Sequence, residues 1–228
     1  MDNIIALIPA RSGSKGIEKK NILMFDGKPL LAHSIFYAKK SFLIKDVVVS
    51  TDSEEFASIS NQFGGRTPFV RPKDLSGDTV EDFPVVNHAV NFLEEENKKK
   101  IDFIALLRPT SPLRPPNLIE KAYEIIKNNA SGTSVRSVVP VKEHSYRQWF
   151  KEGDKLVSVI KNVNEPYNLP RQKLPNSFFQ SGDIEFIKRS TLKDNSVSGN
   201  YVLPLILKQE DLFDIDTLAD LEKELNKD

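Results

Sequence analysis

Apolar and polar positions in the first 140 residues alternate between two patterns. Uninterrupted apolar runs, such as Ile4 to Ile8 and Val47 to Val49, are typical of strands buried on both faces. Between them, apolar residues recur at helical spacing, as at Leu31, Ile35 and Ala38. The pattern predicts strands over 3–8, 46–51, 101–107 and 133–141, and helices over 30–40, 54–63, 78–97 and 116–129. Strands that alternate with helices indicate an α/β fold, with a mainly parallel sheet covered by helices on both faces.

The regular pattern stops near residue 141. Residues 141–188 contain Trp149, a turn at 152–154 and a proline-rich run over 165–175. We expect short antiparallel strands and a loop there, inserted into a single domain of residues 1–228. Such an insertion caps a site, forms a dimer interface or is a solvated flap. The chain then returns with strands over 183–187 and 201–206 and a helix over 217–225, for which Asp216 is the predicted cap.

Composition limits the classes of function. The 228 residues include 32 basic and 32 acidic side chains and no cysteine. A net charge near zero argues against nonspecific binding to nucleic acid. The lack of cysteine excludes disulfides and thiolate zinc sites and fits a reducing compartment. No apolar stretch is long enough to span a membrane, and no leader pattern precedes the first strand. We therefore expect a cytoplasmic protein that binds neither nucleic acid nor membranes.

The segment after the first strand, residues 9–21, is rich in small and basic residues. Glycine and serine leave backbone N–H groups uncovered, and Arg11, Lys15 and Lys20 surround them with positive charge. Its spacing matches neither the P-loop nor the dinucleotide-binding glycine pattern. The segment indicates a polyphosphate site; an ordinary basic turn is the alternative.

Three further segments carry polar groups in stiff or turn-like contexts. Residues 71–79 contain Arg71, Ser76 and Asp78, and the simplest explanation of Asp78 is a cap on the helix predicted to follow it. Residues 108–114 begin with Arg108 and include hydroxyls between two prolines, which suits a prearranged binding loop or a structural turn. The third segment, 170–172, lies in the insertion. In parallel sheets, ligands bind beyond the carboxyl ends of strands, so loops 9–21, 51–53 and 108–114 should lie together.

Two aspartates near the end of the sequence suggest a metal site. In an extended segment, Asp214 and Asp216 share one face and Ile215 the other. Adjacent carboxylates repel unless a cation lies between them, and Mg²⁺ usually takes one or two carboxylates plus phosphate oxygens and water. Helix capping by these aspartates is the alternative.

Taken together, these segments resemble the CMP-acylneuraminate synthetases, the cytidylyltransferases that activate sialic acids and related acid sugars. The matching residues run in the family's order across nearly the whole chain, at 8–11, 14–16, 20–21, 71–72, 76, 78–79, 109–114, 170–172 and 214–217. The resemblance implies a Rossmann-like three-layer nucleotidyltransferase fold, a homodimer with 141–188 as cap or interface, and an Mg²⁺-dependent enzyme. The implied reaction transfers CMP from CTP to the anomeric hydroxyl of a sialic acid-like (nonulosonic) acid and releases pyrophosphate.

The resemblance also implies site residues. The catalytic group comprises Arg11, Lys15, Asp214 and Asp216, of which the aspartates hold the metal. The nucleotide is expected to bind at Ala10, Arg11, Ser14, Lys15, Lys20, Asn21, Arg71 and Ser76. The sugar is expected to bind at Arg108, Thr110, Ser111, Arg147, Arg171 and Gln180.

The sugar side departs from the family pattern. Arg108 stands where the sialate enzymes usually have glutamine, and Arg147 where they have lysine. Asp183 and Glu185 replace an apolar residue and a tyrosine. Arg108 and Arg147 are therefore candidate clamps for the sugar carboxylate. Alternatives are a cytidylyltransferase for another 3-deoxy-ulosonic (Kdo-like) acid, a transferase for another nucleotide, and a non-catalytic nucleotide-sugar binding subunit.

Overall fold

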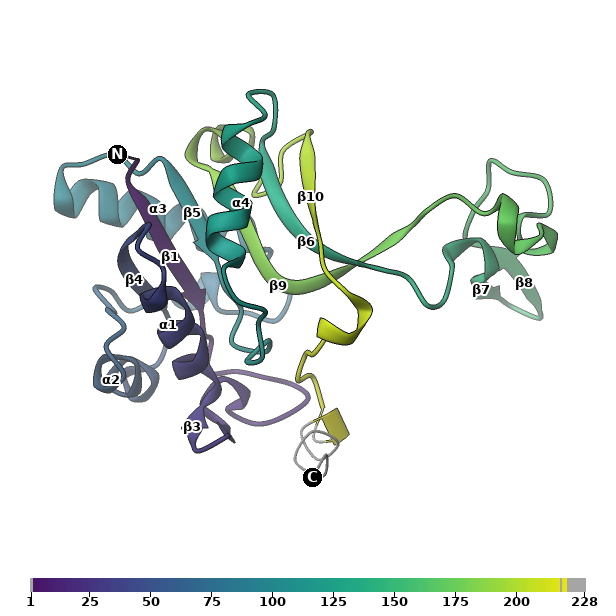
Figure 1. The fold of residues 1–228 in the computed structure, drawn as a ribbon. Coiled ribbons are helices and arrows are strands. Elements are labelled where there is room, and N and C mark those ends of the chain that lie inside the picture. Colours follow the sequence, from purple (N-terminus) through teal and green to yellow (C-terminus); the bar gives the residue numbers. More distant parts are fainter. Residues whose placement is uncertain (1, 218, 221–228) are drawn as a thin grey trace.

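The computed structural model describes residues 2–217 and 219–220. A six-stranded sheet with the order β10-β6-β9-β5-β1-β4 forms the centre of the molecule (Figure 1). Its strands are β1 (Ile4–Pro9), β4 (Ile44–Ser50), β5 (Phe103–Leu106), β6 (Ser134–Pro140), β9 (Phe178–Lys188) and β10 (Val202–Ile206). β1 pairs in parallel with β4 and β5, and β10 with β6, whereas β9 is antiparallel to both of its neighbours. The α/β fold with a mainly parallel sheet, predicted from the sequence, is confirmed.

Helices cover both faces of this sheet. They are α1 (Leu30–Lys40), α2 (Glu54–Gln62), α3 (Asp82–Asn97) and α4 (Leu118–Lys127). Alternate residues of β1 face opposite layers: Ile4 and Ile8 pack in the core that α1 and α4 share, and Ile5 and Leu7 pack against α3. This two-sided burial explains why the strands read as continuous apolar runs. None of the helices in the described part of the chain is long and apolar enough to cross a membrane.

Helix α3 begins four residues later than predicted. It starts at Asp82, with Glu81 in the cap position, so Asp78 does not cap it. Pro84 explains the difference. Proline has no N–H and is tolerated in the first turn of a helix, but a helix starting at Asp78 would place Pro84 in its interior.

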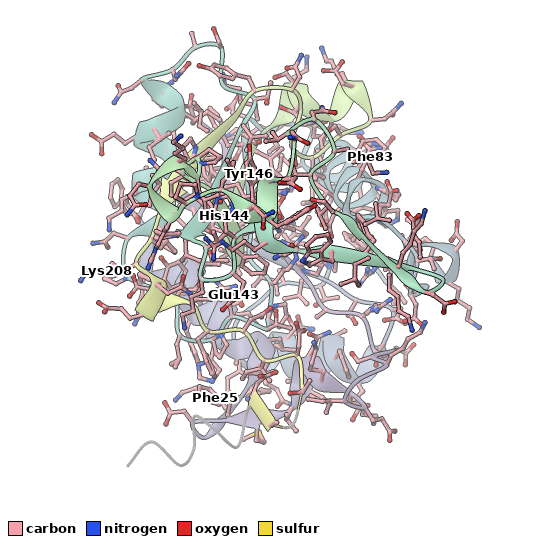
Figure 2. All side chains as sticks on the ribbon, turned by 90° about the vertical axis from the view of Figure 1, so that its right-hand side faces the viewer. Phe25, Phe83, Glu143, His144, Tyr146 and Lys208 are labelled. Carbon is pink, nitrogen blue, oxygen red and sulfur yellow. The ribbon has the colours of Figure 1, made fainter. Side chains whose placement is uncertain are left out.

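Residues 141–177, here called the arm, leave the sheet between β6 and β9 (Figure 1). The arm is connected to the sheet by the paired ends of β6 and β9, where Val139 lies opposite Phe179 and Pro140 opposite Phe178. The arm holds a small hairpin of β7 (Trp149–Glu152) and β8 (Lys155–Ser158) and short 3₁₀ turns. Residues 178–188 of the predicted insertion belong to β9. Figure 2 views the molecule from the side of the arm, with Glu143, His144 and Tyr146 labelled on it.

A second small hairpin, of β2 (Met24–Phe25) and β3 (Lys28–Pro29), precedes α1. The helix predicted over 217–225 lies mostly outside the described residues. At its start, the Asp220 N–H donates to Thr217 Oγ1 over 3.3 Å, and the Thr217 N–H donates to Asp220 Oδ2 over 2.8 Å. Thr217 rather than the predicted Asp216 therefore makes the capping bond, because the Asp216 carboxylate pairs with Lys20 instead.

Candidate active site

A cavity of about 430 Å³ opens beyond the carboxyl ends of β1 and β5. The chain passes from β1 to β4 on one side and then crosses to β5 on the other, and the crevice at such a switch point is where open α/β sheets bind ligands. Loops 9–21 and 108–114 both contribute to its lining. Loop 51–53 holds the first loop in place, because Asp52 accepts bonds from Ser12 N and Oγ over 2.8 and 3.0 Å. The three loops therefore lie together, as predicted.

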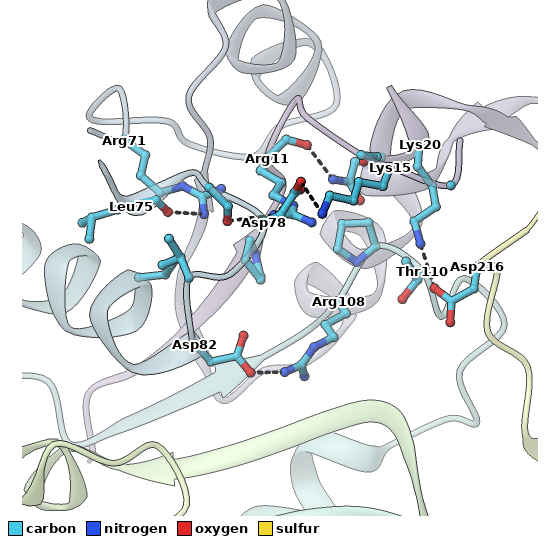
Figure 3. A pocket seen from close by; sticks show the side chains of 18 residues that line it. Arg11, Lys15, Lys20, Arg71, Leu75, Asp78, Asp82, Arg108, Thr110 and Asp216 are labelled. Atoms are coloured by element: carbon cyan, nitrogen blue, oxygen red, sulfur yellow. Dashed lines mark hydrogen bonds and ion pairs between the residues drawn. The ribbon is translucent and has the colours of Figure 1, made fainter. Parts of the chain in front are cut away.

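Arg11, Lys15 and Lys20 form what we call the basic end of the cavity (Figure 3). The Asn21 side chain fixes the loop by donating to the Arg11 carbonyl over 2.9 Å. Ser14 and Gly16 also line the cavity. The loop therefore presents three cations and a short polar side chain around one space, which suits a polyphosphate.

Asp78 lies between these cations rather than on a helix. Its two carboxylate oxygens pair with Arg11 Nη1 and Lys15 Nζ, each over 3.1 Å. Arg11 Nη1 also donates to the Gly77 carbonyl over 2.8 Å. All three charged side chains retain solvent exposure, 32% for Arg11, 78% for Lys15 and 35% for Asp78. Solvent-exposed pairs of this kind are weak, so an anionic ligand can replace Asp78 as their partner.

Arg71 is buried in the wall of the cavity. Its Nη2 donates to the Ser50 carbonyl over 2.9 Å, at the end of β4. Burial lowers the pKa of Arg71, and the charge of Arg11 lowers it further, whereas Asp52 opposes the shift. Two other predicted nucleotide residues, Ala10 and Ser76, are not among the lining side chains. Ala10 is fully buried beside the first loop, and Ser76 donates to the Pro72 carbonyl over 3.0 Å.

Asp214 and Asp216 lie on either side of a buried anchor, Ile215. Ile215 is fully buried among Ile17, Phe25 and Leu30, and its N–H donates to the Thr110 carbonyl over 2.8 Å. This part of the chain is irregular rather than a strand. The Asp216 carboxylate lines the cavity and accepts from Lys20 Nζ over 2.8 Å. Asp214 is not among the lining side chains.

Asp214 is half-buried and lies close to the negative charge of Asp216. Burial raises the pKa of Asp214 and the adjacent negative charge of Asp216 raises it too, while a hydrogen bond from Thr110 lowers it. No cluster of three or more metal-ligating side chains occurs among the described residues. Two neighbouring carboxylates that repel one another nevertheless match the usual protein contribution to a Mg²⁺ site, in which phosphate and water supply the other oxygens.

Opposite the basic end, Arg108 belongs to a connected set of charges. Its Nη1 donates to Glu185 Oε1 over 2.7 Å, and its Nη2 pairs with Asp82 at the start of α3. Glu185 is only 3% exposed and also accepts from Arg136 Nη2 over 2.5 Å. We call these four residues the Arg108 network. Burial alone would lower the pKa of Arg108, but the carboxylates of Glu185 and Asp82 outweigh it and raise that pKa.

The other predicted sugar residues are dispersed. Thr110 lines the cavity, but Ser111 is buried behind it, 3.5 Å from Asp214 Oδ1. Gln180 accepts from Arg136 Nη1 over 2.7 Å, outside the cavity lining. Arg147 and Arg171 lie on the arm, where they line a separate hollow.

Sequence reasoning missed several groups that line the cavity. Asp78 and Asp82 contribute carboxylates, and Leu75, Val80 and Val85 contribute apolar surface. The signal for Asp82 was Pro84, which marks the first turn of α3 and therefore places Asp82 at the N-terminus of that helix. The apolar residues gave no signal, because their pattern fits an ordinary loop and helix face.

Comparison with known proteins finds a matching protein family, relatives in sequence and a relative in structure. Residues 5–175 match the model of a family described as cytidylyltransferase. The chain is 34% identical to the post-translational flagellin modification protein B of Campylobacter coli, over 97% of this chain and 93% of that protein. It is 31% identical to the pseudaminic acid cytidylyltransferase of Campylobacter jejuni, over 96% and 93%. A CMP:2-keto-3-deoxy-manno-octonic acid synthetase solved with CTP shares the fold, with a TM-score of 0.71 and 17% identity over 98% of this chain and 97% of that one.

Proposed function

Because the chain belongs to the cytidylyltransferase family, we propose that it transfers CMP from CTP to the anomeric hydroxyl of a nonulosonic acid and releases pyrophosphate. One observation carries this proposal. The basic end and the Asp214–Asp216 segment, about two hundred positions apart in sequence, meet in one cavity through the Lys20–Asp216 ion pair. The cavity thus joins a site for a polyphosphate to the carboxylate of Asp216, and Asp214, two residues earlier, is the second carboxylate of the proposed cation site.

The transfer is an in-line displacement. The anomeric oxygen attacks the α-phosphorus, the bond from that phosphorus to the bridging oxygen of pyrophosphate breaks, and the hydroxyl proton is lost. Such a reaction depends on positioning and on neutralising charge rather than on a covalent intermediate. Arg11 and Lys15 would exchange Asp78 for triphosphate oxygens, with Ser14 and Lys20 assisting. The cytosine and ribose would lie toward Arg71 and Asn21, near Ala10 and Ser76.

Asp214 and Asp216 are the residues that would hold Mg²⁺. The ion would neutralise phosphate charge and ease ionisation of the attacking hydroxyl. The chain's own contribution is the placement of these carboxylates: buried Ile215 fixes the backbone between them, and Thr110 bonds to that backbone. Lys20 holds Asp216 at the cavity wall until the substrate enters.

The arm supports a homodimer. Its apolar surface includes Trp149, Phe150 and Leu156, which are 39%, 53% and 62% exposed. Arg147 and Arg171 line a hollow that is separate from the cavity, and the arm extends away from the central sheet (Figure 1). We propose that the arm packs against a second copy and supplies these two arginines to its sugar site. Light scattering of the purified protein tests the dimer, and a monomer at assay concentration would contradict it.

A pyrophosphate-release assay tests the function. CTP, ATP, GTP and UTP are each paired with sialic, legionaminic, pseudaminic and Kdo-type acids, with and without Mg²⁺. Turnover with CTP, Mg²⁺ and a nonulosonic acid is expected. Turnover only with the Kdo-type acid or with another nucleotide would replace the proposal, and no turnover with any pair would indicate a non-catalytic binding subunit.

A further inference from the structure

Arg108 faces the cavity with both arms of its guanidinium already bonded. Nη1 donates to Glu185, and Nη2 pairs with Asp82. A carboxylate is clamped in bidentate fashion when both arms are available to it. A guanidinium has five N–H donors, so a sugar carboxylate could still reach those that these two bonds leave, but it would lie beside the negative charges of Glu185 and Asp82 unless it displaced one of them.

The pair with Glu185 is difficult to displace. Glu185 is 3% exposed and pairs with both Arg108 and Arg136, so displacing it from them would leave its own buried charge without these partners. Asp78 at the basic end differs, because its partners are solvated and exchangeable. Arg108 thus resembles a structural brace more than an open anion site.

The group of this network that meets the cavity is Asp82. It lines the cavity, and its side chain is 44% exposed. One oxygen, Oδ2, pairs with Arg108, and the other points away from Arg108 (Figure 3). The position of Asp82 is fixed on two sides, by the first turn of α3 and by Arg108.

We propose that Asp82 is a specificity-determining residue that accepts a hydrogen bond from a neutral donor group of the acid sugar, and that Arg108 positions it. This inference rests on the proposed function and identifies the part of the cavity that selects the acceptor. The two carboxylates and two guanidiniums of the network carry no net charge, so Asp82 needs no further cation, and it repels an anion. A neutral N–H or O–H group is the partner that this arrangement suits. An acylamino group and a hydroxyl group both supply one.

The test compares Asp82→Asn with a matched control, Asp74→Asn. Asp74 is an exposed aspartate in the neighbouring 3₁₀ turn and is absent from the cavity lining. Initial rates are measured while CTP and the acid sugar are varied in turn. Asp82→Asn should raise the KM for the sugar roughly 10- to 100-fold, the range for loss of a hydrogen bond to a charged group. Its KM for CTP and both constants of Asp74→Asn should stay within about twofold of wild type.

Arg108→Gln separates positioning from direct binding. If Arg108 acts through Asp82, Arg108→Gln and the double variant with Asp82→Asn should raise the sugar KM about as much as Asp82→Asn alone, because coupled residues are non-additive. A large effect of Arg108→Gln together with a normal Asp82→Asn would show that Arg108 clamps the sugar carboxylate, and would overturn the proposal. A rise in the KM of Asp82→Asn for CTP would indicate that Asp82 contacts cytosine, and it would also overturn the proposal. Thermal melting of each variant checks that it folds.

Acceptor analogues identify the donor. In each analogue, one acylamino or hydroxyl group of the sugar is replaced by hydrogen. For the analogue that lacks the partner of Asp82, the sugar KM of wild type should rise, whereas that of Asp82→Asn should be the same as with the intact sugar. If Asp82→Asn remains equally harmful with every such analogue, the proposal is wrong. Failure of wild type to use any acid sugar would refute the proposed function itself, whereas a working wild type with an unaffected Asp82→Asn would refute only this inference.

Discussion

The two ends of the cavity hold their charges in different ways. At the basic end, Arg11 and Lys15 share Asp78 on solvent-exposed loops. At the other end, Arg108 is bonded to Glu185, which is nearly inaccessible and lies on a strand of the sheet. Exposed pairs exchange partners at little cost, whereas buried pairs are difficult to break. The comparison suggests that the basic end is built to receive an anion and the Arg108 network to keep a fixed shape.

The largest expected effect is at Asp216, whose carboxylate pairs with Lys20 of the basic end. Asp216→Asn should lower kcat roughly 10²- to 10³-fold, because a neutral amide is a poorer partner for a divalent cation at the transferring phosphoryl group. The measurement is pyrophosphate release at saturating substrates, with circular dichroism to verify the fold. Normal activity, or activity that persists in EDTA, would remove the metal assignment.

Stability should separate the two ends almost as clearly. Glu185→Gln removes the carboxylate that pairs with Arg136 and one of the two that pair with Arg108, and it should cost about 3 kcal/mol of unfolding free energy. Asp78→Asn removes only exposed pairs and should cost less than about 1 kcal/mol. Urea denaturation of both variants measures the difference. Equal losses of unfolding free energy would mean that the charge pairs at the two ends contribute equally to stability.

Arg11→Ala tests the basic end itself. It removes one charged contact to the triphosphate, so the KM for CTP should rise roughly 10- to 100-fold. The sugar KM should stay close to that of wild type. Two-substrate kinetics provide both constants, and an unchanged CTP KM would show that the triphosphate binds elsewhere.

Ionic strength should have the smallest effect. Between about 0.05 and about 0.5 M salt, exposed charges are screened far more than buried ones. The KM for CTP should therefore rise several-fold, and the KM for the sugar should change less. Steady-state rates across this range measure both, and a steeper response of the sugar would reverse the assignment of the two ends.

The sequence predicted the helices and strands correctly where one or both faces of the element are buried. Continuous apolar runs at β1 and β4, and helical spacing in α1, were enough to predict the sheet and its layers. The start of α3 was misplaced because Asp78 looks like a helix cap, although Pro84 carried the correct signal. The short antiparallel strands predicted for the arm are confirmed by the β7–β8 hairpin, but the sequence did not indicate their bounds, because these strands are short and largely exposed.

The candidate site was predictable only in part, because some of its residues are close in sequence and others are brought together only by the fold. Arg11, Lys15 and Lys20 follow directly from a strand and a small-residue loop, so local sequence places them together. The bonds of Arg108 to Asp82 and Glu185 join the loop after β5 to α3 and β9, and no local pattern indicates which carboxylates an arginine will meet. From the sequence, Arg108 is a candidate clamp for the sugar carboxylate, which stays a prediction, and in the structure its partners are the protein carboxylates of Asp82 and Glu185.

One crossed measurement tests the central claim that the two ends serve two substrates. Initial rates of wild type, Arg11→Ala and Asp82→Asn are recorded over a grid of CTP and acid sugar concentrations. Arg11→Ala should raise only the KM for CTP, and Asp82→Asn should raise only the KM for the sugar. If both variants raise the same constant, the two ends do not serve two substrates.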